Sequence, residues 1–149
     1  MVAEPRRILG LLTAEGIRDA DITISPQCNR VPVVHGHLEC VSVSFDRMPA
    51  DFAEIGLVLR SFATPDAVVG LPSAPAQAIQ VLEAEDAPQP RRDVMAGRGM
   101  TVSVGRVRPC EVLDAKFVLL VHNTIRGAAG GAVLNAELLV RTGRLKSRS

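Results

Sequence analysis

Aromatic and charged residues are both scarce in this chain. Its 149 residues include no tryptophan, no tyrosine and only four phenylalanines, and 22% are charged with a net charge of +1. Proteins that bind single-stranded DNA or RNA without sequence preference stack the bases on aromatic side chains. Because this chain has so few aromatic residues, we expect no nucleic-acid partner. A chain that is 47% hydrophobic and nearly neutral is also neither disordered nor a polyanion binder. The composition predicts one soluble globular domain.

Long apolar runs and paired cysteines are also missing. The longest uninterrupted apolar run covers five residues, 117–121, far short of the length of a membrane span. The first residues carry no apolar stretch typical of a secretory signal. Cys28, Cys40 and Cys110 are odd in number and show no CxxC spacing, which argues against a disulfide framework and a zinc site. We therefore expect a cytoplasmic protein with no membrane partner and no metal.

Hydrophobic periodicity predicts an α+β domain. Apolar spacing predicts a helix over 49–62, and alternation predicts half-buried strands at 38–45 and 101–107. Strands that are mostly separated by turns, without a βαβα rhythm, favour a mixed or antiparallel sheet with helices packed on one face. The other expected elements are a helix at 5–14, a strand at 21–25, an irregular stretch at 63–100 with a short strand near 78–82, a strand at 116–121 buried on both faces, and a helix at 128–141.

The densest polar cluster, residues 27–39, lies on the approach to a predicted strand. A guanidinium grips a carboxylate with two parallel hydrogen bonds, and an imidazole moves protons at neutral pH. Arg30 and His37 are therefore candidates for holding an acidic substrate and for acid/base chemistry. The alternative is that these are ordinary surface residues near a turn. A zinc site at the His-x-His pair would need a third ligand, which the spacing does not supply.

The second cluster, residues 122–131, links the predicted strand at 116–121 to the last helix. Asn123 and Thr124 stand where a side chain caps a helix or points into a cleft. The first helical turn is built of alanine and glycine, so its N–H groups are open to a polar or anionic ligand. Tight helix packing with an ordinary cap explains the same residues, and physical reasoning alone favours it. The stretch is neither a Walker loop nor a GxGxxG motif.

Taken together, these stretches resemble one family. Residues 28–33 (Cys-Asn-Arg-Val-Pro-Val), followed by the Gly-His-x-Glu at 36–39, are similar to the substrate and acid/base motif of the archaeal and fungal branch of aspartate-semialdehyde dehydrogenase. Residues 97–106 look like the next signature, 122–131 like the strand-to-helix junction near the nicotinamide, and 88–90 like a weaker fourth match. The resemblance covers nearly the whole chain. It implies the C-terminal catalytic and dimerisation fold of semialdehyde and glyceraldehyde-3-phosphate dehydrogenases.

The resemblance implies reversible, NADP-dependent reduction of β-aspartyl phosphate to aspartate semialdehyde and phosphate, a step toward lysine, threonine and methionine. His37 falls on the acid/base histidine, and Arg30 falls on the arginine that grips the substrate carboxylate. Asn123, with Thr124, falls where the family meets the nicotinamide. His35 departs from the pattern, because aspartate often stands there. A homodimer or homotetramer is implied as well.

The resemblance also implies that part of the enzyme is missing. The family's N-terminal NADP-binding domain carries a glycine-rich loop and a nucleophilic cysteine in a Ser-Cys-Thr-Asn context, and neither is found in residues 1–149. We therefore expect the chain to be the C-terminal domain alone, beginning within a helix through truncation, a split gene or an internal start, and inactive by itself. Two alternatives stay open. One is a related acyl reductase of the malonyl-CoA or N-acetyl-glutamyl-phosphate type, and the other is a non-enzymatic remnant that self-associates.

Overall fold

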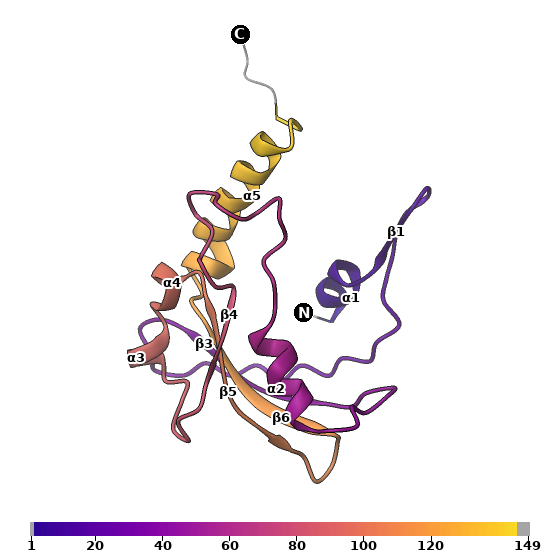
Figure 1. The fold of residues 1–149 in the computed structure, drawn as a ribbon, viewed down its shortest axis with the longest axis vertical. Coiled ribbons are helices and arrows are strands. Elements are labelled where there is room, and N and C mark those ends of the chain that lie inside the picture. Colours follow the sequence, from indigo (N-terminus) through magenta and orange to yellow (C-terminus); the bar gives the residue numbers. More distant parts are fainter. Residues whose placement is uncertain (1, 146–149) are drawn as a thin grey trace. The chain divides into compact units, whose positions relative to one another are not determined.

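The structure is a computed structural model that describes residues 2–145. It divides into two compact units, Met1–Pro32 and Val33–Ser149 (Figure 1). The first unit holds a short helix and a hairpin, and the second holds a four-stranded sheet with the remaining helices. Within residues 2–145, no helix is long and apolar enough to cross a membrane.

The first unit differs from its predicted helix at 5–14. Helix α1 (Ala3–Ile8) ends early, and the antiparallel hairpin of β1 (Leu11–Thr13) and β2 (Gly16–Arg18) follows. The hydroxyl of Thr13 bonds to the carbonyl of Gly16 at 2.8 Å and closes the turn. Leu11 and Leu12 fit the apolar stripe of a helix as well as they fit a strand. In the structure their backbone N–H and C=O groups form hydrogen bonds by pairing with β2. The prediction was wrong beyond Ile8 because tertiary pairing outweighs a short periodic run.

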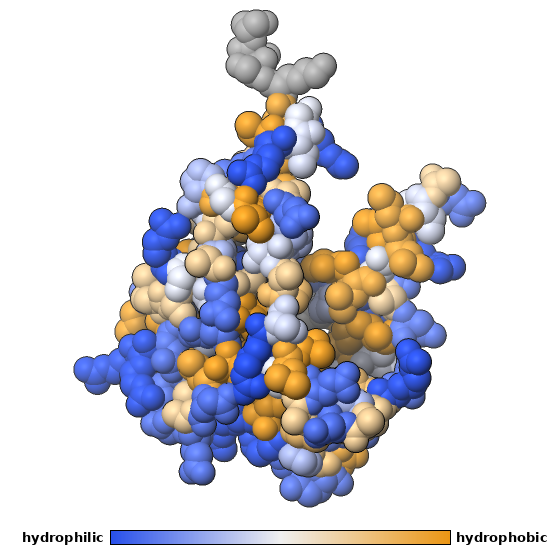
Figure 2. Space-filling model, in the orientation of Figure 1, coloured by the Kyte–Doolittle hydropathy of each residue, from blue (hydrophilic) through white to orange (hydrophobic). Residues whose placement is uncertain are grey.

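The predicted strand at 21–25 is also absent, since residues 19–36 form no helix or strand. Alternation provides two faces, but a strand needs a neighbour for its hydrogen bonds, and none pairs with this segment in the described part of the chain. None of residues 2–32 is fully buried. Leu12, at 85% exposed, is the extreme case, and Figure 2 shows hydrophobic residues in orange gathered on the hairpin.

The second unit is built on a mixed sheet in the order β3-β6-β5-β4. The central strands β6 (Ala115–Val121) and β5 (Val102–Pro109) pair with each other antiparallel, with a register shift between Gly105 and Arg108. The edge strand β3 (His37–Val43) lies antiparallel to β6, and β4 (Ile79–Leu82) lies parallel to β5. The strands predicted at 38–45, 78–82, 101–107 and 116–121 are all confirmed, and their sheet is mixed as expected.

Burial along β6 corrects one expectation. Val118 and Leu120 are buried, whereas Phe117, Leu119 and Val121, which alternate with them, are only half-buried. The strand is therefore covered on one face and partly open on the other, although its apolar sequence predicts burial on both. Pairing places Val41 of β3 opposite Phe117, on the partly open face. Val43 is opposite Ala115, which is fully buried. The buried apolar residues are Ile55, Leu71, Ala87, Met100, Val104, Ala115, Val118 and Leu120.

The helices of this unit are short except for the last. Helix α2 (Ala53–Arg60) packs against β4 and buries Ile55, so the helix predicted at 49–62 is confirmed over its middle. The irregular stretch contains two single turns, α3 (Pro90–Asp93) and α4 (Ala96–Gly99). A π-helix, η1 (Ile125–Ala129), is followed directly by α5 (Gly130–Arg141). Helix α5 confirms the last predicted helix, and it extends away from the sheet (Figure 1). The α+β class is confirmed.

Candidate functional site

Antiparallel pairing brings residues 33–39 of the first polar cluster and the start of the second cluster to one end of the sheet. His37 opens β3 and is opposite Val121, the last residue of β6. Residues 122–125 follow Val121 directly, so they lie beside the turn that precedes His37. The imidazole of His37 is exposed at this edge. The pairing thus joins two sequence motifs that are more than eighty residues apart.

Gly36 and Asn123 make the contact between the clusters. The side-chain oxygen Oδ1 of Asn123 accepts a hydrogen bond from the backbone N–H of Gly36 at 3.0 Å. Gly36 is buried with φ of 105°, and a Cβ there would lie 2.9 Å from Cδ1 of Leu120. Both the backbone angle and the space therefore require glycine. Asn123 consequently fixes the backbone from which His37 projects.

His122 closes the turn on the other side. Its ring is 3% exposed, and its Nδ1 accepts the backbone N–H of Ile125 at 3.2 Å. An Nδ1 that accepts requires the neutral ring to carry its proton on Nε2. Burial of the ring, followed by the charge of His35, lowers the pKa of His122 below its ordinary value. The two rings are stacked, with centroids 4.9 Å apart.

This arrangement corrects the expected helix cap. Neither Thr124 nor Ala129, the residues before η1 and α5, makes a side-chain cap hydrogen bond. The N–H of Ile125, the first residue of η1, is taken by the His122 ring instead, and the hydroxyl of Thr124 lies 3.3 Å from the same Nδ1. Sequence reasoning assigned no separate role to His122. Its place immediately after a buried strand is the one signal that could have identified it.

Arg30 belongs to the first unit, where it is exposed and lies outside any helix or strand. His37, Asn123 and Thr124 belong to the second unit and gather at one end of the sheet. Arg30 as the carboxylate clamp therefore stays a prediction. The same holds for His37 as acid/base and for Asn123 and Thr124 at the cofactor.

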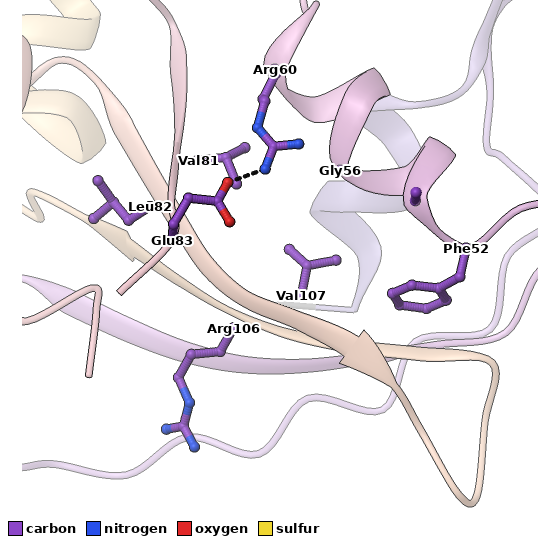
Figure 3. Close-up of a pocket in the computed structure, with 9 residues that line it drawn as sticks. Phe52, Gly56, Arg60, Val81, Leu82, Glu83, Arg106 and Val107 are labelled. Atoms are coloured by element: carbon purple, nitrogen blue, oxygen red, sulfur yellow. Dashed lines mark hydrogen bonds and ion pairs between the residues drawn. The ribbon is translucent and has the colours of Figure 1, made fainter. Parts of the chain in front are cut away.

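A separate hollow of about 270 Å³ lies at the opposite edge of the sheet, between α2 and β4 (Figure 3). Arg60 of α2 and Glu83, just after β4, form an ion pair across it. Arg106 points away from this pair, on the other side of β5. The hollow thus holds one satisfied ion pair and no histidine, and β3 lies at the far edge of the sheet. Among residues 2–145, no three His, Cys, Asp or Glu side chains are grouped to hold a metal ion.

Comparison with known proteins finds a family model that matches most of the chain. Residues 3–126 match the family model described as semialdehyde dehydrogenase, dimerisation domain. The aspartate-semialdehyde dehydrogenase of Schizosaccharomyces pombe is 45% identical over 144 residues, which cover 94% of this chain and 40% of the relative.

Solved structures show the same likeness. The Candida albicans aspartate-semialdehyde dehydrogenase with NADP has a TM-score of 0.85 at 42% identity, covering 97% of this chain and 42% of that one. The Vibrio cholerae enzyme II complexed with ASA has a TM-score of 0.58 at 32% identity, covering 75% and 29%. The chain spans about 40% of the length of the curated relatives that it matches. It belongs to the aspartate-semialdehyde dehydrogenase family, as the C-terminal dimerisation domain.

Proposed function

We propose that this chain supplies the acid/base and substrate-gripping residues of an NADP-dependent aspartate-semialdehyde dehydrogenase of the cytoplasm. The observation that carries the proposal is the contact between Gly36 and Asn123, which assembles the two family motifs around His37. Relatives named aspartate-semialdehyde dehydrogenase match at 43–46% identity in yeasts and an archaeon. These names favour the aspartyl substrate over the malonyl-CoA and N-acetyl-glutamyl-phosphate types.

His37 is assigned the proton transfer. Its exposed ring projects from a turn that is held by a buried glycine and by strand pairing, so its backbone is fixed while its nitrogens remain accessible. A positioned imidazole of this kind exchanges a proton with the reacting thiol or aldehyde oxygen. Arg30 is assigned the substrate carboxylate, because its planar guanidinium forms two parallel hydrogen bonds with such a group.

When bound, NADP⁺ would accept a hydride, and NADPH would donate one in the reverse direction. Asn123 suits the nicotinamide end, because its Oδ1 accepts the N–H of Gly36 and its amide Nδ2 can donate to a carboxamide oxygen. Thr124 is exposed and adjacent, so its hydroxyl can take part as well. We propose that the glycine-rich loop and the nucleophilic cysteine of the family are supplied from outside residues 1–149.

Self-association is part of the proposal. The family model is a dimerisation domain, and the sheet face formed by β3 and β6 leaves Val41, Phe117 and Leu119 half-buried. A second copy that packs on this face would remove the apolar area from water. We therefore propose a homodimer, or a tetramer built from such dimers.

The test is a hybrid enzyme in which this chain replaces the matching 42% of the Candida albicans relative. We expect the hybrid to reduce NADP⁺ with aspartate semialdehyde only when phosphate is present, and we expect the isolated chain to show no turnover. A folded hybrid without phosphate-dependent activity would support the non-enzymatic remnant and overturn the proposal. Turnover by the isolated chain would show that the reaction needs no second domain.

A further inference from the structure

His122 is a buried polar side chain beside the candidate site. Its ring is 3% exposed, and one face stacks on His35. Gly99 adjoins it, since a Cβ at that position would lie 3.2 Å from Cδ2 of the ring. The ring therefore cannot rotate or shift without displacing a neighbour.

The ring and the main chain of His122 together close the segment that contains Asn123. Nδ1 accepts the N–H of Ile125 at 3.2 Å, and the carbonyl of His122 accepts the N–H of Gly127 at 3.1 Å. The second bond spans five residues, which is the spacing of a π-helix. Both hydrogen bonds close a segment that begins at His122 and includes Asn123, so the backbone of Asn123 has little conformational freedom.

A continuous chain of contacts therefore runs from the buried ring to the turn before His37. Asn123 adjoins His122 and accepts the N–H of Gly36 at 3.0 Å, and Gly36 precedes His37. We infer that His122 is a positioning residue, whose neutral ring holds Asn123 and, through Gly36, the backbone that presents His37. This inference rests on the proposed function only for the role of His37.

The surroundings of the ring support the neutral form. The ring is buried and His35 is stacked on it, and burial, followed by the charge of His35, lowers the pKa of His122. A proton on Nδ1 would remove the acceptor of the Ile125 N–H and place a positive charge in this enclosed position beside His35. The contacts therefore hold only while Nδ1 is unprotonated.

The first experiment uses this chain and amide hydrogen exchange measured by NMR. His122→Phe keeps a flat ring but removes the acceptor, and His122→Asn keeps an acceptor close to the position of Nδ1. We expect His122→Phe to speed exchange of the Gly36 and Ile125 amides by about tenfold, and His122→Asn to leave both within about threefold of wild type. Unchanged exchange at Gly36 in His122→Phe would overturn the inference, as would an Nδ1–H tautomer of His122 in wild type.

The second experiment uses the hybrid enzyme. A positioning residue predicts that His122→Phe lowers kcat by about tenfold with KM within about twofold, and that His122→Asn restores most of kcat. Equal losses in both variants, or a loss confined to KM, would contradict it. If the wild-type hybrid itself is inactive, the proposed function fails, while the exchange data still decide whether His122 holds Gly36.

Discussion

The side-chain oxygen of Asn123 accepts the backbone N–H of Gly36 at 3.0 Å, although the two residues are 87 positions apart. Each belongs to a motif that sequence reasoning treats separately. Strand pairing between β3 and β6 brings the motifs to one end of the sheet, and this hydrogen bond ties them together. Asn123 therefore has a structural contact in addition to its proposed contact with the cofactor.

Replacing Asn123 with alanine should destabilise the chain. The N–H of Gly36, a buried residue, would lose its acceptor, at a cost of about 1–3 kcal/mol. The measurement is the free energy of unfolding in urea, with Asn123→Asp as the control because a carboxylate still accepts the bond. Equal stability of Asn123→Ala and wild type would mean that water replaces the side chain.

Much of the fold follows from local pattern. The strands β3, β5 and β6 alternate or run apolar over lengths typical of strands, and α5 has both an apolar stripe and a glycine after its end. The pattern could not separate a helix from a hairpin over 5–14, because Leu11 and Leu12 satisfy both periods. It also could not foresee that one face of β6 stays half-buried. The coverage of a strand depends on what packs against it, which local sequence does not state.

Sequence reasoning singled out the candidate site residues one by one but not their arrangement. His37 and Asn123 stood out as types of residue in suggestive places, and the sheet brings them together. His122 was overlooked because a histidine after a strand has no distinctive spacing, and its role depends on the N–H of Ile125 and the ring of His35. Such contacts are set by tertiary structure and leave little trace in a single sequence.

Asp114 should make the chain acid-sensitive. Its Oδ2 accepts the N–H of Phe45 at 2.7 Å and the hydroxyl of Ser44 at 2.9 Å, and these bonds hold its pKa below the ordinary 3.8. A carboxyl with a lowered folded-state pKa stabilises the fold fully above its unfolded-state pKa, and the contribution is lost as pH falls through the folded-state value. Asp114→Asn cannot titrate. Its free energy of unfolding should therefore fall less than that of wild type as the pH is lowered through and below about 4.

Ser44→Ala is the matched control for this pH series, because it removes one of the two donors and keeps the carboxyl. Its loss of stability on acidification should lie between those of wild type and Asp114→Asn. Identical pH profiles for all three proteins would show that these bonds do not couple Asp114 to folding.

Arg30→Lys in the hybrid enzyme tests the substrate clamp. Lysine keeps the positive charge but loses the planar fork, so KM for aspartate semialdehyde should rise by about tenfold while kcat changes less. Arg18→Lys, an exposed arginine in β2, is the control for the substitution itself. An unchanged KM in Arg30→Lys would remove this residue from the substrate site.

His37→Asn in the hybrid enzyme is the decisive variant for the chemistry. Asparagine can still form hydrogen bonds at the start of β3, but it carries no proton at neutral pH. General acid–base groups contribute about 10² to 10⁴-fold in rate, so kcat should fall by that factor while KM moves little. The reason is that proton transfer is an interaction made chiefly in the transition state.

The neighbouring histidine provides the control for that variant. His35→Phe keeps a ring to stack on His122 at the observed 4.9 Å but has no nitrogen to carry a proton. If His37 alone moves the proton, His35→Phe should retain kcat within about threefold, because the stacked ring and the Gly36 turn are preserved. Equal losses in the two variants would mean that His35 shares the proton transfer or that the motif is structural. Near-normal turnover in His37→Asn would assign the acid/base role to another residue.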